Sequence, residues 1–121
     1  MKKSFLFLSV LLTFFFATNL FAQNFQTGKF SGNYQSEGFN LNKGEGKRTY
    51  SVEVKFKKAY EVAPTIILTV NHLNAETKDG VRVRYEVTTK GISRDGFLIE
   101  VATWEDSKIH EIRGDWVAFN E

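Results

Sequence analysis

Residues 50–57 read YSVEVKFK and indicate most clearly which kind of fold this chain adopts. Apolar side chains stand at Tyr50, Val52, Val54 and Phe56, and the positions between them are polar or charged. Because successive side chains of a strand point to opposite faces of its sheet, this alternation predicts a strand with one face on a core and the other in water.

Two later runs extend the pattern. Residues 65–70 follow Pro64 and are apolar on both sides, which predicts a strand covered on both faces. Residues 81–88 carry their valines and Tyr85 on one face, which we expect in the core, and two arginines on the other face. Both runs therefore read as strands rather than helices.

The remaining runs lie at 25–34, 97–102 and 109–119. The last of them changes phase near Gly114, which predicts a bulge or bend there. Six strands joined by short turns predict an all-β fold, a six-stranded antiparallel β-sandwich in a single domain. Turn residues that separate the runs lie at 38–46, 79–80 and 95–96.

The first 22 residues differ in composition from the rest. Lys2 and Lys3 precede a predominantly apolar run at 5–16, and small or polar residues follow up to Ala22. This order is typical of a secretory signal peptide, and the run is shorter than the roughly 20 residues of a membrane-spanning helix. We expect a signal peptide at 1–22, a mature domain at 23–121 without a membrane span, and secretion to an extracellular or periplasmic space.

The mature domain carries no net charge. Two of the sixteen basic residues lie in the leader, which leaves fourteen against fourteen acidic residues. Nucleic-acid binding needs a surplus of Lys and Arg, so a nucleic-acid partner is not expected. The chain has no cysteine, so a domain of about 100 residues must rely on packing, or on contacts between protomers, instead of disulfides.

Catalytic and metal-binding patterns are not evident in the sequence. His72 and His110 lack the spacing of a metal site. Glu105 and Asp106 are adjacent acids, but neighbouring residues of a strand point to opposite sides. We therefore predict a protein that is not an enzyme and that needs no metal or other cofactor.

Residues 104–107, Trp-Glu-Asp-Ser, lie on a loop between two predicted strands. An indole beside short polar side chains on such a loop favours sugar binding. An indole can cover the apolar face of a pyranose, carboxylates can accept hydrogen bonds from its hydroxyls, and Arg82 or Arg84 can donate to its oxygens. A packing role explains Trp104 equally well, and Arg84 beside Glu86 fits a cross-strand ion pair.

Short motifs follow one another in order along the mature chain. The most specific is residues 103–110, TWEDSKIH, followed by WVA at 116–118. The others are FQTGK at 25–29, VKF at 54–56, Tyr60, Pro64 with the apolar run to Asn74, RYEV at 84–87, and GF at 96–97. Together these motifs resemble the H-type lectin domain, the family of the snail agglutinins and of the carbohydrate-binding domain of discoidins.

The resemblance implies a β-sandwich that assembles as a trimer, sometimes stacked into a hexamer. It implies glycan partners of the galactose or N-acetylgalactosamine type, bound in clefts between protomers. It also places Phe97 and Trp116 in the core and the arginine-bearing face of residues 81–85 at a protomer interface. By position, the implied ligand-binding residues are Arg84, Trp104, Glu105 and Asp106, with Gly44 and Glu45 near the contact that a neighbouring protomer donates.

Some positions depart from the family pattern and keep alternatives open. Glu105 stands where the best-known animal members have histidine. The acidic position near Glu45 is aspartate in those members. The sugar specificity is therefore open, as is the choice between Arg84 and Arg82, although the spacing to Phe97 favours Arg84. The alternative function is a structural or adhesion module with the same fold and no functional sugar site. An enzyme built on this scaffold has the least support.

Overall fold

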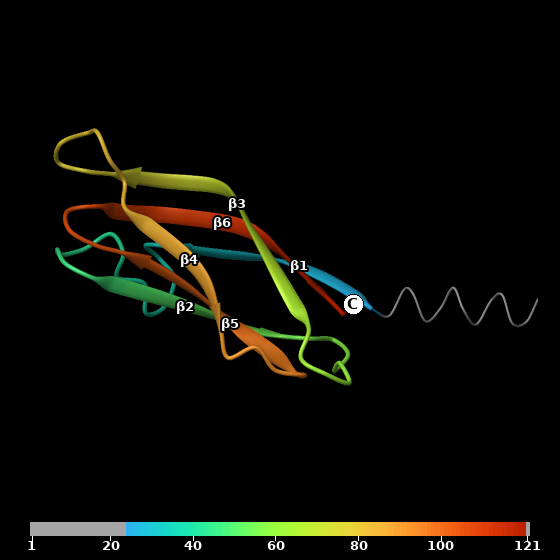
Figure 1. Cartoon of the computed structure of the whole chain (residues 1–121). Helices are drawn as coiled ribbons and strands as arrows, with labels where there is room; N and C mark the ends of the chain where they lie inside the picture. The colour runs from blue at the N-terminus through green and yellow to red at the C-terminus, as the bar shows by residue number, and fades with distance from the viewer. Residues whose placement is uncertain (1–23, 121) are drawn as a thin grey trace, which may run out of the picture.

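The computed structural model describes residues 24–120, which form six strands in two three-stranded sheets (Figure 1). The strands are β1 (Phe25–Asn33), β2 (Arg48–Lys55), β3 (Thr65–Glu76), β4 (Tyr85–Lys90), β5 (Gly96–Thr103) and β6 (Lys108–Phe119). This arrangement confirms the predicted six-stranded antiparallel sandwich. The expected signal peptide at 1–22 lies outside the described residues. Between residues 24 and 120, no helix has the length and apolar character needed to cross a membrane.

Each sheet is built around one central strand. In the first sheet β6 lies between β1 and β3, and in the second β5 lies between β2 and β4. All four pairings are antiparallel. Within the part of the chain that the structure describes, β1, β2, β3 and β4 are consequently edge strands, each with one hydrogen-bonded neighbour.

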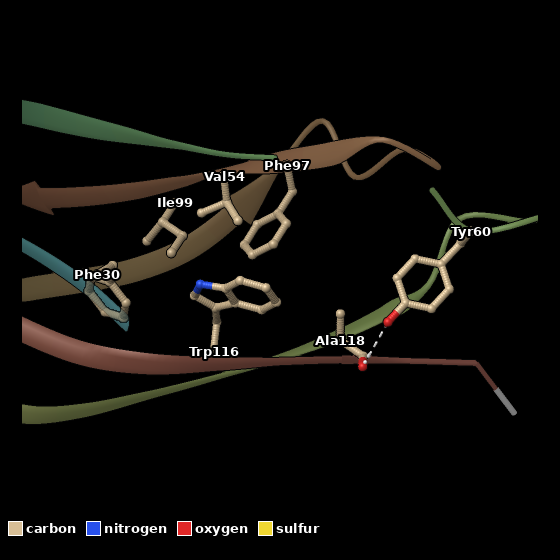
Figure 2. Packing of buried hydrophobic residues seen from close by; sticks show 7 residues of the cluster. All are labelled: Phe30, Val54, Tyr60, Phe97, Ile99, Trp116 and Ala118. Atoms are coloured by element: carbon tan, nitrogen blue, oxygen red, sulfur yellow. Dashed lines mark hydrogen bonds between the residues drawn. The ribbon is translucent and has the colours of Figure 1, made fainter. Parts of the chain in front are cut away.

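Aromatic side chains fill the space between the sheets at one end of the sandwich. Trp116 of β6 points between the layers toward Phe97, Ile99 and Val54 (Figure 2). The rings of Phe97 and Trp116 meet edge to face with centroids 5.5 Å apart, an arrangement that their quadrupoles favour. The buried hydroxyl of Tyr60 donates to the Ala118 carbonyl at 3.1 Å. The core positions expected for Phe97 and Trp116 are confirmed.

A second core cluster supports the other end of the sandwich. It consists of Phe39, Leu41, Val101, Ile109 and Ile112. Leu41 lies in the β1–β2 loop, and its carbonyl accepts a hydrogen bond of 2.9 Å from the Ile109 amide at the start of β6. The loop is thereby anchored to the same framework that carries the β5–β6 turn.

The phase change in the last strand arises at His110 instead of Gly114. The register of β3 with β6 passes from Asn74↔Glu111 to Ala75↔Ile109, so His110 is an extra residue in β6. This bulge lets both Ile109 and Ile112 point inward. A second irregularity, between Val70 and His72, lies in β3 opposite Gly114 and Arg113.

The prediction that residues 65–70 are covered on both faces is wrong for the single chain. β3 is an edge strand, and Ile67 on its outer face is 50% exposed. Only some side chains of this apolar run are buried: Ile66 and Leu68 pack inward, while Ile67 and Val70 remain accessible. β3 also continues to Glu76, well beyond the apolar segment.

The predicted strand at 81–88 begins only at Tyr85, and its expected core side chains are accessible. Val81 is 75% exposed, and Val83 and Tyr85 also lie at the surface. Side chains replace the strand ladder here: the Asp79 carboxylate accepts from the Val81 amide at 3.0 Å, which is an Asx-type turn. The period-two alternation of residues 81–84 therefore lies in a loop.

Candidate functional site

Three loops meet at one end of the sandwich, on the left in Figure 1. They are the β1–β2 loop, the β3–β4 loop and the β5–β6 turn. The Gly46 amide donates to the Glu105 carbonyl at 3.1 Å, which joins the first loop to the third. The Lys78 amide donates to an Asp106 carboxylate oxygen at 3.3 Å, which joins the second loop to the third.

Arg48, at the start of β2, holds two of these loops together, a role that sequence reasoning missed. Its side chain is buried, with 9% of the residue exposed. Its guanidinium donates five hydrogen bonds of 2.7 to 3.4 Å. The acceptors are the carbonyl oxygens of Leu41, Lys43, Gly46, Glu105 and Ser107. A planar donor fork suits such a set of fixed acceptors.

Arg84 is fixed beside the β5–β6 turn by its backbone. The Arg84 amide donates to the Ser107 hydroxyl at 2.9 Å, and its carbonyl accepts from the Thr103 hydroxyl at 2.7 Å. Both Thr103 and Ser107 are fully buried, so the anchor is rigid. These two hydroxyls give a physical reason for a Thr and a Ser on either side of the Trp-Glu-Asp segment.

The Arg84 side chain lies against the two acids that the sequence singled out. Its Nε is 3.1 Å from Glu105 Oε2, and its Nη1 is 3.9 Å from Asp106 Oδ1. Glu105 adopts a φ of 57°, which is uncommon for a residue other than glycine and marks the tight turn. The arginine thus finds its partners in its own chain; Glu86, the cross-strand candidate, forms no ion pair within the described residues.

Glu45 lies beside this cluster and is connected to it through Lys78. Lys78 Nζ is 2.7 Å from Glu45 Oε1, and the Lys78 amide contacts Asp106. The hydrogen bond from the ammonium lowers the pKa of Glu45, and the same bond raises the pKa of Lys78. Gly44, at a φ of 67°, faces open space. Arg84, Glu105, Asp106 and Glu45 are therefore brought to one end of a single protomer.

Trp104 lines an adjoining hollow on the outer face of the β2-β5-β4 sheet. The hollow has a volume of about 560 Å³. Trp104 is half-buried there and directly precedes Glu105, which links the hollow to the charged cluster. The remaining wall residues are Lys47, Glu86, Thr88, Thr89, Lys90, Glu100 and Ala102.

The chemistry of this end is that of hydrogen bonding and stacking. Carboxylates, hydroxyls, cationic donors and an indole are present, all of which suit a neutral polyhydroxylated ligand. Within residues 24–120, no group of three or more His, Cys, Asp or Glu side chains could hold a metal ion. Fold and site together are those of a small β-sandwich whose loop end gathers groups that suit a sugar ligand.

The chain belongs to the H-type lectin domain family, whose model matches residues 51–119. This match covers more than half of the chain and includes the segments of Arg84, Trp104, Glu105 and Asp106. It confirms the resemblance drawn from the sequence motifs. Carbohydrate binding is accordingly the function class that family and fold support.

Similar proteins include the discoidins of Dictyostelium discoideum. Discoidin-2 is 29% identical over 79 residues, which are 65% of this chain and 30% of that protein. A solved structure of recombinant discoidin II superposes with a TM-score of 0.70 at 29% identity, covering 80% of this chain and 37% of the other. The chain therefore spans about a third of the length of these discoidins. A product of Fuscovulum blasticum described as ATP synthase subunits region ORF 7 is 26% identical over 83 residues, 69% of this chain and 70% of that protein.

Proposed function

We propose that this protein is a secreted lectin that binds glycans of the galactose or N-acetylgalactosamine type between protomers, without catalysis. The observation that carries the proposal is the position of Trp104 in a polar hollow, next in the chain to Glu105 of the Arg84–Glu105–Asp106 cluster. Membership of the H-type lectin domain family and similarity to the discoidins support it.

The proposed contacts follow from the donors and acceptors at this end. The Trp104 indole covers the apolar C–H face of the sugar ring. A guanidinium has five N–H donors, and the contacts of Arg84 with Glu105 and Asp106 engage only part of them. Arg84 therefore retains donors for sugar hydroxyls, while the Glu105 and Asp106 carboxylates serve as acceptors.

The proposed assembly is a trimer or a hexamer. In it, Gly44 and Glu45 of one protomer reach the sugar held by Trp104 and Arg84 of the next. Several weak sites on one particle give a much higher avidity than one site, which suits glycans displayed on a surface. Secretion is proposed from the leader at 1–22.

Glycan-array binding and calorimetry with N-acetylgalactosamine test this proposal. Trp104→Ala and Arg84→Ala should abolish binding while the fold is retained. Arg82→Ala and Tyr34→Ala are matched controls, since both residues are exposed and lie outside the cluster. A well-folded wild-type protein that ignores every glycan would overturn the proposal, and loss of binding in the Arg82 variant alone would transfer the arginine's role to that residue.

The second candidate function is a structural or adhesion module without a sugar site. It is favoured by the ion pair of Arg84 with Glu105, which occupies the arginine's Nε. Thermal melts distinguish the two candidate functions, because a ligand that binds only the folded state raises the melting temperature of the protein. No shift at saturating galactose, N-acetylgalactosamine or a mixed glycan pool, in the wild type and in Glu105→His alike, would favour the module.

A further inference from the structure

A second surface feature lies away from the loops, on the side where the edge strands β1 and β2 border the same groove. The groove has a volume of about 790 Å³. Its apolar lining residues are Phe25, which is 59% exposed, the half-buried Val52, and the core residues Val54 and Trp116, which are 9% and 7% exposed. A Cβ at Gly28 would lie 2.6 Å from the Trp116 indole, so the glycine lets the indole pack against β1.

Four lysines surround the groove and give it a strongly positive rim. They are Lys29, Lys55, Lys57 and Lys58, and Glu53 is the one acid among the lining residues. All four lysines are exposed, and within the described residues none lies within 4 Å of a carboxylate. The mature chain is neutral overall, so this rim is a local excess of positive charge.

The backbone of both bordering strands is open toward the groove. Among residues 24–120, β1 pairs only with β6 and β2 pairs only with β5, so no described strand lies beside the other edge of either. Unpaired N–H and C=O groups along a strand edge are a template for an added strand.

Gln26 already makes a contact of this kind at one end of the groove. Its side-chain amide accepts from the Lys57 and Lys58 amides at 3.1 and 3.4 Å and donates to the Lys58 carbonyl at 2.7 Å. The amide group thus pairs with backbone across the gap as a peptide group would. It also holds the two lysines at the groove.

We infer that this groove binds an extended acidic peptide, which adds as a strand to the open edge of β1 or β2. Strand addition uses main-chain hydrogen bonds for affinity and alternate side chains for specificity. A peptide that alternates apolar and acidic residues matches the groove: its apolar side chains meet Phe25 and Val52, and its carboxylates meet the lysines. An anionic polysaccharide would use the lysines alone. The site is separate from the proposed sugar site, so each can fail independently.

Edge lysines also have a purely protective role in many proteins, because their charge opposes pairing with a second copy of the chain. That role predicts a different result. Charge reversal would then cause self-association and leave no peptide binding to lose.

The test uses the mature chain, 23–121, and a blocked peptide of about six residues, the length of an ordinary strand, in which Glu and Val alternate. Binding is followed by tryptophan fluorescence and by hydrogen exchange of the β1 and β2 amides. The double variant Lys55→Glu/Lys58→Glu should weaken binding roughly tenfold, as expected for two surface charge pairs. The matched control, Lys43→Glu/Lys47→Glu, makes the same change in net charge at the opposite end and should bind as the wild type does.

Three comparisons decide the outcome. Binding of the alternating peptide, with new exchange protection in β1 or β2 and the expected loss in the groove variant, supports the inference. Equal binding of a Lys–Val peptide, or binding of a sulfated polysaccharide without any binding of the acidic peptide, overturns it. The inference is also overturned if the wild type binds no peptide and the groove variant self-associates. The lysines then have only the protective role.

Discussion

Arg48 is the residue on which the architecture of the loop end most depends. Its buried guanidinium satisfies five carbonyl oxygens from two loops. Arg48→Met keeps much of the side-chain volume but removes the guanidinium donor from five carbonyls, among them the buried Ser107 carbonyl, so we expect a loss of about 2–4 kcal/mol in the free energy of unfolding. Urea unfolding measures the change. Arg82→Met, at an exposed position, is the control and should lie within about 0.5 kcal/mol of the wild type.

No sequence pattern could have identified Arg48. Its acceptors are main-chain carbonyls, which every residue carries, and two of them lie 57 and 59 residues away in the chain. Trp104, Glu105 and Asp106 could be selected from the sequence as candidates because their residue types imply chemistry and because they are adjacent. The ion pair of Arg84 with Glu105 was not foreseen, since it depends on the turn at Glu105 with its φ of 57°.

Glu45 and Lys78 give the charged cluster a measurable pH dependence. The Lys78 ammonium lowers the pKa of Glu45, so Lys78→Met should raise that pKa toward its ordinary value. A lowered carboxyl pKa means that the pair's contribution is present above the unfolded pKa and is lost as the pH falls through the folded one. A carbon-detected NMR titration of the Glu45 carboxyl tests this. An identical Glu45 pKa in wild type and variant would show that the pair does not form in solution.

At the scale of the strands, alternation predicted most of the sheet because burial on one face is a local property of sequence. Residues 50–57 and 97–102 agree closely with β2 and β5. The pattern failed at 81–84, where Asp79, Thr103 and Ser107 supply side-chain hydrogen bonds that hold the backbone in a loop. It also placed the irregularity of β6 at a glycine, although the bulge lies at His110. Contacts distant in sequence decide such positions.

Gly114 has a different task, which is to allow β3 and Phe30 to approach the central strand. A Cβ at this position would lie 2.0 Å from the Thr69 carbonyl oxygen and 2.5 Å from the Phe30 ring. Gly114→Ala should therefore force the pairing of β3 with β6 apart and cost about 1–3 kcal/mol of stability. Thermal unfolding measures the loss. The control is Arg113→Ala, at the exposed residue directly before the glycine, which should change stability far less. Equal effects of the two substitutions would contradict a steric role for Gly114.

For the whole molecule, stability has to come from a small core without disulfides, and the single chain leaves several large apolar side chains at its surface. Ile67, Val81 and Phe25 are 50%, 75% and 59% exposed. If the proposed trimer buries part of this surface, unfolding includes dissociation, and the melting temperature must rise with protein concentration. Calorimetry across a wide range of concentrations, together with light scattering, tests the prediction. The mass of a single chain, together with a melting temperature that does not change with concentration, would exclude the trimer. Glu45 could then contact a sugar only beside the Arg84 of its own protomer.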